Sequence, residues 1–127
     1  MPKIPKKVAK KYSVSDELKE RAYRFALGIL ELASMLPNTD EGRIIRRQLC
    51  KSGTSVGANL EEADGSLTLN DFVYKVDAAF KEAKETRYWL RIVIARKLLK
   101  EKVVMPHLGE CVELIKILST IIYKCLK

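Results

Sequence analysis

Hydrophobic residues recur every three or four positions along four long stretches of the chain, and this spacing predicts four amphipathic helices. The first predicted helix begins after Ser15, a favourable N-cap that two acidic residues follow, and it ends before Pro37. Its single apolar stripe consists of Leu18, Ala22, Phe25, Ile29, Leu32, Ala33 and Leu36. One stripe of this width is typical of a helix that packs one face against a core.

The second predicted helix runs from Thr39 to about Gly65, and two glycines interrupt its middle. Its stripe consists of Ile45, Leu49, Ser52, Val56, Asn59, Leu60 and Ala63. Each interior glycine costs a helix about 1 kcal/mol relative to alanine. Gly53 and Gly57 lie four residues apart on one side, so we expect another helix to approach closely there. A broken helix or a loop is the alternative.

The third predicted helix begins at Thr68, whose spacing from Asp71 resembles a capping box, and it extends to about Lys100. Its core stripe consists of Phe72, Val76, Ala79, Phe80, Ala83, Leu90, Ile94 and Leu98. A second patch, made of Tyr74, Ala78, Trp89 and Ile92, lies elsewhere on its circumference. A helix inside a monomeric bundle needs only one stripe, so the second patch requires another explanation.

The fourth predicted helix begins near Pro106, a favourable residue for a first turn, with His107 beside it on the surface. It carries two adjacent apolar stripes, and large exposed apolar patches are rare in monomers. We therefore expect a subunit interface made of Trp89, Ile92, Leu114, Leu118 and Ile121. A central helix buried within one bundle is the alternative.

Short connections between four helices predict an all-α, up-down-up-down four-helix bundle. The length of 127 residues favours one domain. We assign residues 13–127 to the bundle and residues 1–12, with five lysines and no acidic residue, to a flexible lysine-rich arm. Such an arm contacts polyanions or serves only to keep the protein in solution, and the charge pattern leaves both open.

Composition argues against an enzyme. The chain has one histidine, three widely spaced cysteines and no acidic cluster at metal-ligand spacing, so we expect no catalytic residues, metal or cofactor. No apolar run approaches the roughly 18 residues of a membrane span, so no membrane partner is expected. The cysteine usage favours free thiols and a cytoplasmic protein.

Two of the predicted helices carry a specific family resemblance. In the second it comprises Arg47-Gln48-Leu49, the run from Ser52 to Val56 and Asn59-Leu60-Glu61-Glu62, and in the third Phe72 and the run from Ala83 to Leu90. These residues resemble the "four helix bundle protein" family, first noted as reading frames in intervening sequences of bacterial 23S rRNA genes. The resemblance covers roughly residues 15–126. Ala63 departs from it, because many members have glycine there.

The resemblance implies a bundle that assembles into a ring-like homopentamer with a central opening and has no known enzymatic activity or cofactor. The same superfamily includes the accessory variability proteins of diversity-generating retroelements, which are basic pentamers that bind a reverse transcriptase and nucleic acid. Among the family positions, Asn59, Glu62 and Glu85 are polar. We expect them to fix the register between helices or subunits, with Arg47, Arg96 or the Asn59 amide as donors to the glutamates.

The sequence and the resemblance together suggest two functions. The chain carries a net charge of +8, and the first hypothesis is a nucleic-acid-binding pentamer of low sequence specificity, with RNA as the favoured ligand. Its expected contacts are Arg43, Arg46 and Arg47 on the second helix and Lys84, Arg87, Tyr88 and Arg91 on the third. The alternative is a protein-interaction scaffold, for example an accessory subunit of a reverse transcriptase. For any single charge, an ordinary solvated surface is the simpler interpretation.

Overall fold

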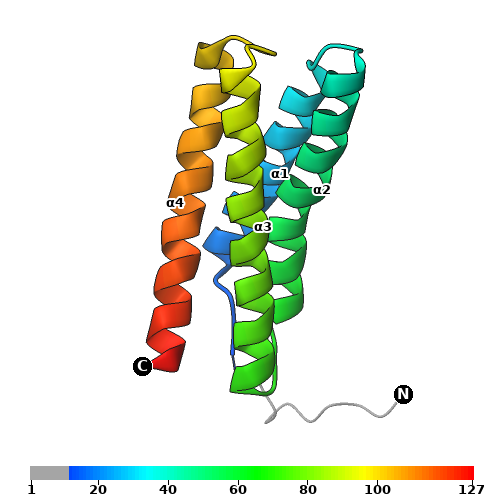
Figure 1. Cartoon of the computed structure of the whole chain (residues 1–127). Coiled ribbons are helices and arrows are strands. Elements are labelled where there is room, and N and C mark those ends of the chain that lie inside the picture. Colours follow the sequence, from blue (N-terminus) through cyan, green and yellow to red (C-terminus); the bar gives the residue numbers. More distant parts are fainter. Residues whose placement is uncertain (1–11) are drawn as a thin grey trace, which may run out of the picture.

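The computed structural model describes residues 12–127, and these residues form four helices and no strand. The helices are α1 (Asp16–Ser34), α2 (Asp40–Ala63), α3 (Leu69–Ala95) and α4 (Glu101–Leu126). Figure 1 shows that they run alternately up and down, so each is antiparallel to the one before it. The predicted all-α four-helix bundle is therefore confirmed at the level of the single chain.

Short polar side chains cap the first three helices, as their sequence spacing predicts. The hydroxyl oxygens of Ser15, Thr39 and Thr68 accept hydrogen bonds from backbone N–H groups three residues ahead, at 3.0–3.1 Å. Each bond satisfies a donor that has no partner within its own helix. These caps fix the points at which α1, α2 and α3 begin.

The glycine-rich middle of α2 is a continuous helix, and α1 packs closely against it. A Cβ atom at Gly53 would lie 2.6 Å from Cγ2 of Ile29, which is closer than real contacts allow. A Cβ at Gly57 would lie 3.6 Å from Ala22, an ordinary contact. The predicted close approach of another helix is confirmed, with Gly53 as the residue that requires it.

Two predicted helix ends differ from the structure. α3 ends at Ala95 rather than near Lys100, because Lys97 adopts a left-handed backbone conformation with φ of 55°. α4 begins at Glu101, so Pro106 lies inside the helix rather than at its start. Pro106 and Lys102 are both exposed, so the Lys102 carbonyl that loses its helical donor can bond to water.

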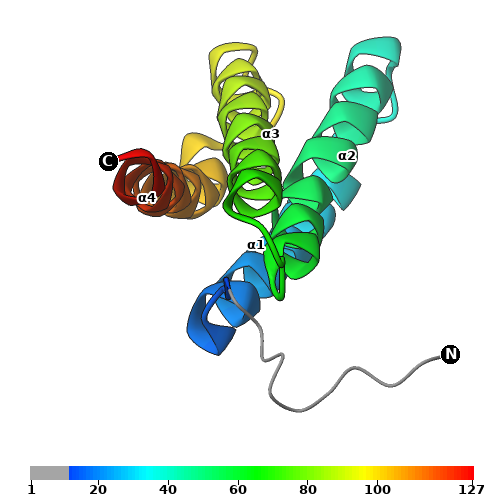
Figure 2. The ribbon, with the colours of Figure 1, turned by 90° about the horizontal axis from the view of Figure 1, so that it is seen from below.

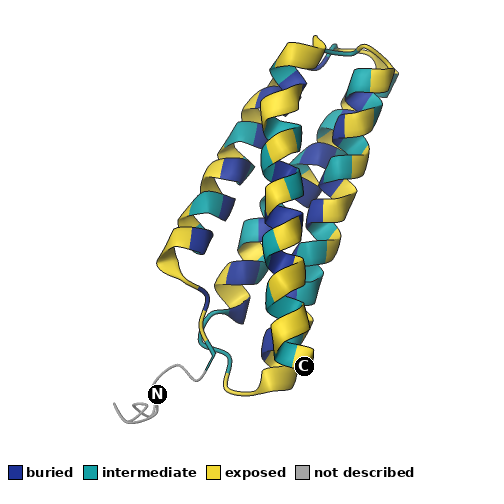
Figure 3. Ribbon diagram, turned by 90° about the vertical axis from the view of Figure 1, so that its left-hand side faces the viewer, coloured by how far each residue is buried: buried dark blue, intermediate teal, exposed yellow. Residues whose placement is uncertain are grey.

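Helices adjacent in sequence pack side by side in the bundle, while α1 and α4 make the sparsest contact. Figure 2, which looks along the bundle, shows α4 standing apart from α1. Buried residues face the interior and exposed residues face outward on every helix (Figure 3). All seven predicted α1 core residues are buried. In residues 12–127 the only buried polar residues are Ser52 and Thr86.

At one end of the bundle, the segment before α1 is tied to the connection between α2 and α3. Tyr12 forms an isolated antiparallel bridge with Ser66. Asp64 accepts a hydrogen bond from the backbone N–H of Val14 at 2.9 Å and pairs with Lys19 at 2.7 Å. Except for Tyr12, the predicted lysine-rich arm lies outside the described residues. None of the helices in the described part is long and apolar enough to cross a membrane.

Candidate nucleic-acid interface

Four residues expected to contact nucleic acid lie on α3: Lys84, Arg87, Tyr88 and Arg91. The three cations follow i, i+3, i+7 spacing, which places them along one side of the helix. Within residues 12–127, none of the three forms an ion pair with a carboxylate. Lys84 and Arg91 are exposed, and Arg87 is half-buried. We call these three residues the α3 basic row.

Tyr88 stands beside the α3 basic row with 55% of its surface exposed. Its ring meets the ring of Trp89 edge-on, with the centroids 5.1 Å apart and an interplanar angle of 76°. Tyr88 and Arg91 also line a surface hollow of about 370 Å³, together with Ile92, Ile94 and Ala95. The structure therefore brings an aromatic ring, a guanidinium group and an apolar floor together.

Two ion pairs with α2 identify the side of α3 that faces α2, and residues spaced by multiples of seven lie on that side. Lys75 pairs with Glu62 of α2 at 2.8 Å, and Arg96 pairs with Glu41 of α2 at 2.6 Å. Trp89 lies seven residues before Arg96 and fourteen after Lys75, so it lies on that same side. The half-buried Trp89 thus faces α2 and not α4, and its place in a subunit interface stays a prediction.

The three polar residues expected to fix register have different partners. Glu62 joins α2 to α3 through Lys75. Asn59 forms its hydrogen bond within its own helix, where its side-chain amide donates to the Ser55 carbonyl at 2.8 Å. Glu85 accepts from the Trp89 indole N–H at 3.4 Å. The expected donors Arg47, Arg96 and the Asn59 amide therefore serve neither Glu62 nor Glu85.

Glu82, which no sequence pattern marks, lies on α3 close to Lys51 of α2. Burial raises the pKa of its carboxyl group, and the neighbouring Glu85 raises it further. Its buried Oε1 has no hydrogen-bond partner among residues 12–127.

The expected arginine cluster on α2 separates into three environments. Arg46 donates to the Ala33 carbonyl at 3.1 Å and to the Leu36 carbonyl at 2.7 Å. Because the last turn of α1 contains no basic residue, Arg46 supplies donors that the end of α1 lacks. These bonds give Arg46 a structural role in the single chain, and its contact with nucleic acid stays a prediction. Arg43 and Arg47 are both exposed, and Arg43 bonds to Asn38 and Asp40.

The fourth helix presents a different apolar face from the one predicted. Leu114 and Leu118 are 0% exposed within the single chain, so they belong to the core and cannot form a surface. Cys111 lies beside them, and burial raises the pKa of its thiol to about 12. Ile121 is half-buried against α1. Several side chains that remain at least partly exposed lie along one face and form an apolar stripe of Met105, Leu108, Val112, Tyr123 and Leu126, which the exposed Lys116 and Ser119 interrupt.

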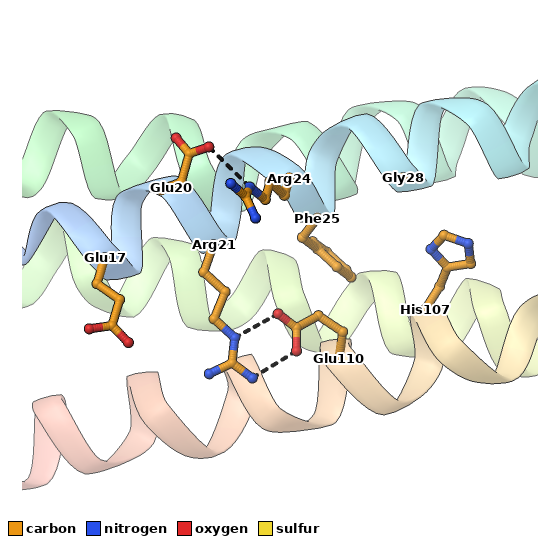
Figure 4. A pocket seen from close by; sticks show the side chains of 8 residues that line it. All are labelled: Glu17, Glu20, Arg21, Arg24, Phe25, Gly28, His107 and Glu110. Carbon is orange, nitrogen blue, oxygen red and sulfur yellow. Dashed lines mark hydrogen bonds and ion pairs between the residues drawn. The ribbon is translucent and has the colours of Figure 1, made fainter.

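A cleft of about 500 Å³, which no sequence pattern indicates, lies between α1 and α4 (Figure 4). Arg21 spans the cleft with two hydrogen bonds to Glu110, at 2.7 and 2.8 Å. His107 points toward Gly28, and a Cβ there would lie 3.0 Å from its ring. Burial lowers the pKa of His107. The histidine was expected on the surface but is half-buried, because α4 begins before it.

No short motif marks this cleft, because Arg21 and Glu110, whose ion pair spans it, are 89 positions apart in sequence. The remaining lining residues are Glu17, Glu20, Arg24 and Phe25. Among the described residues, no group of three histidine, cysteine or acidic side chains is placed to hold a metal ion.

Comparison with known proteins supports the family resemblance. A family profile described as "23S rRNA-intervening sequence protein" matches residues 15–120. A crystal structure of a protein of unknown function from the S23 ribosomal protein family of Bacteroides thetaiotaomicron is similar, with a TM-score of 0.77 and 33% sequence identity. The similarity covers 83% of this chain and 97% of that one. None of the curated proteins compared with the chain matches it. The chain belongs to the 23S rRNA-intervening sequence protein family.

Proposed function

We propose that this protein is a cytoplasmic, non-enzymatic homopentamer that binds nucleic acid, with RNA as the favoured ligand and low sequence specificity. The observation that carries the proposal is the α3 basic row beside the exposed Tyr88. Its three cations have no carboxylate partner within residues 12–127, so they remain available to phosphate groups. An exposed aromatic ring next to them suits the stacking of bases.

Phosphate contacts of this kind carry little sequence information, because every nucleotide presents the same phosphate. Asparagine and glutamine, which form paired hydrogen bonds to adenine, are absent from Lys84–Arg91. We therefore expect affinity to depend strongly on salt and weakly on sequence.

The apolar stripe of α4 supports self-association. Tyr123 is 67% exposed, Leu126 is 69% exposed and Met105 is 46% exposed in the single chain. Burying them against another copy would remove apolar surface from water, which favours assembly by roughly 25 cal/mol per Å². Five copies of a chain with net charge +8 would carry about +40, which raises the local attraction for a polyanion. The number five comes from the family resemblance.

The experiment is size-exclusion chromatography with light scattering, with and without a short structured RNA. The proposal predicts the mass of a pentamer that co-elutes with RNA at about 50 mM salt and releases it by about 200 mM. A monomer would refute the assembly, and a pentamer that does not bind RNA at low salt would refute the nucleic-acid role.

The α4 apolar stripe also favours one alternative, a scaffold that docks a protein partner such as a reverse transcriptase. In that case the stripe binds the partner rather than another copy. Met105→Ser together with Leu126→Ser distinguishes the two, because it dissociates a pentamer held by the stripe. A scaffold that uses the stripe for its partner keeps its oligomeric mass in this variant.

A further inference from the structure

The hollow beside the α3 basic row has the composition of a base-binding site. Tyr88, Arg91, Ile92 and Ala95 occupy positions i, i+3, i+4 and i+7, so they surround one point on the outer surface of α3. Because the Ala95 side chain is small, it leaves an open space, and the larger lining side chains surround that space. The result is a hollow of about 370 Å³ that is open to solvent and lined by one ring, one guanidinium group and aliphatic carbons.

The aromatic wall of this hollow is held in position before any ligand binds. Trp89 meets Tyr88 edge-on at 5.1 Å between centroids, and the Trp89 indole in turn donates to Glu85. Edge-to-face pairs of this geometry are favourable in their own right. Because the Tyr88 ring is already packed on one side, stacking a base on it costs less conformational entropy than ordering a free ring.

Charge is distributed unequally on the two sides of Tyr88. Arg87 of the α3 basic row lies close to Cys111 of α4, so the row is on the side toward α4. Lys84 lies over the Phe80 ring of its own helix, 4.5 Å from the centroid. Glu85 lies on the other side, toward α2. The phosphates of a bound strand would therefore contact the α3 basic row on the side toward α4. Its bases would then point toward Tyr88 and the hollow.

We propose that the hollow bordered by Tyr88 and Arg91 binds an unpaired nucleobase, so that the protein selects single-stranded or looped nucleic acid over a continuous duplex. The proposal rests on the proposed function and deepens it by naming the form of the ligand. Bases within a duplex are stacked on their neighbours and cannot reach a ring on a convex helix. An unpaired base has a free face, and stacking does not depend on which base it is.

The experiment compares the affinity of the full chain for three probes at one low salt concentration: oligouridine, an abasic strand of equal length, and an RNA duplex. The variant is Tyr88→Ala, and Tyr88→Phe keeps the ring. Tyr74→Ala is the matched control, because Tyr74 is an exposed tyrosine on the same helix, 71% accessible, away from the α3 basic row.

Wild type should bind oligouridine roughly 5- to 150-fold more tightly than the abasic strand, the range found for one stacked base. Tyr88→Ala should lose this preference while its affinity for the abasic strand and the duplex stays unchanged. Tyr88→Phe and Tyr74→Ala should keep it. The emission of Trp89, the single tryptophan of the chain, gives a second readout, because it should change with oligouridine and not with the abasic strand.

Three results would overturn the proposal. If wild type binds all three probes alike, or if Tyr88→Ala keeps the wild-type preference, the hollow is not a base site and the nucleic-acid role stands on charge alone. If Tyr88→Ala changes the oligomeric mass instead, the hollow receives a side chain of another copy. If wild type binds no probe, this proposal and the proposed function both fail.

Discussion

The hydroxyl groups of Ser52 and Thr86 lie 2.9 Å apart in the centre of the bundle, where their hydrogen bond joins α2 to α3. Both residues are almost completely buried. Thr86 is also within 2.8 Å of the Glu82 carbonyl one turn earlier on α3, whereas Ser52 has no second side-chain bond in the described part of the chain. A single polar pair at this depth fixes the register of two helices that could otherwise slide along an apolar seam.

Replacing Thr86 by valine keeps the volume but leaves the Ser52 hydroxyl buried without that partner. We expect this variant to lose about 1–3 kcal/mol of the free energy of unfolding. Ser52→Ala should cost less, because Thr86 keeps the Glu82 carbonyl. The double variant should lose less than the sum of the two single losses, and urea unfolding followed by circular dichroism measures all three. Strict additivity would show that the pair does not act as a unit.

Replacing each of the two interior glycines of α2 by alanine should change the free energy of unfolding in opposite directions. Gly53→Ala forces a Cβ into Ile29, so we expect a loss of about 1–3 kcal/mol. Gly57→Ala meets only ordinary contacts at 3.6 Å, so the better helix propensity of alanine should raise stability by about 0.5–1 kcal/mol. Thermal unfolding of the two variants tests this. Equal shifts of the same sign would contradict the close packing of α1 on Gly53.

Arg46 and Arg47 are adjacent, yet the structure separates their roles. Arg46→Ala removes both bonds to the end of α1 and should cost about 1–3 kcal/mol. Arg47→Ala removes an exposed side chain and should change stability by less than about 0.5 kcal/mol. Unfolding measurements at equal protein concentration compare them. If the two variants are equally stable, the capping role of Arg46 is wrong.

The free energy of unfolding should depend on pH through His107. Burial lowers its pKa in the folded state, and nearby Glu31 offsets only part of the effect. The unfolded chain therefore binds a proton more readily, so stability is highest above about pH 6.5 and declines as pH falls through the lower, folded value. His107→Gln cannot titrate, so its stability should fall less than that of wild type between about pH 7 and pH 5. Identical slopes would contradict this prediction.

Much of the fold follows from local sequence signals. Ser15, Thr39 and Thr68 mark helix starts through side chains that act within one turn, so spacing alone identifies them. The end of α3 could not be predicted, because Lys97 carries no signal for the left-handed conformation that it adopts. Pro106 misled the prediction for α4, since it lies inside the helix, where water can bond to the exposed Lys102 carbonyl that loses its helical donor.

The exposed faces of the helices were harder to predict than the helices themselves, because they depend on which helix packs against which. Leu114 and Met105 are both apolar residues of α4. Leu114 lies in the core and Met105 on the surface only because of how the neighbouring helices pack. The pair of Arg21 and Glu110 likewise exists only because the fold brings α1 within reach of α4. On α3, in contrast, the positions of Lys84, Arg87, Tyr88 and Arg91 relative to one another follow from helical spacing within one element.

The most direct test of the proposed nucleic-acid role is the salt dependence of RNA affinity in two matched triple variants. Lys84→Gln, Arg87→Gln and Arg91→Gln together remove the α3 basic row. Arg24→Gln, Lys81→Gln and Lys116→Gln together remove the same charge from exposed side chains that already pair with carboxylates. The first variant should bind RNA more weakly, with a salt slope lower by about two units, while the second should keep the wild-type slope. Equal slopes in both variants would contradict the assignment of the α3 basic row as the nucleic-acid interface.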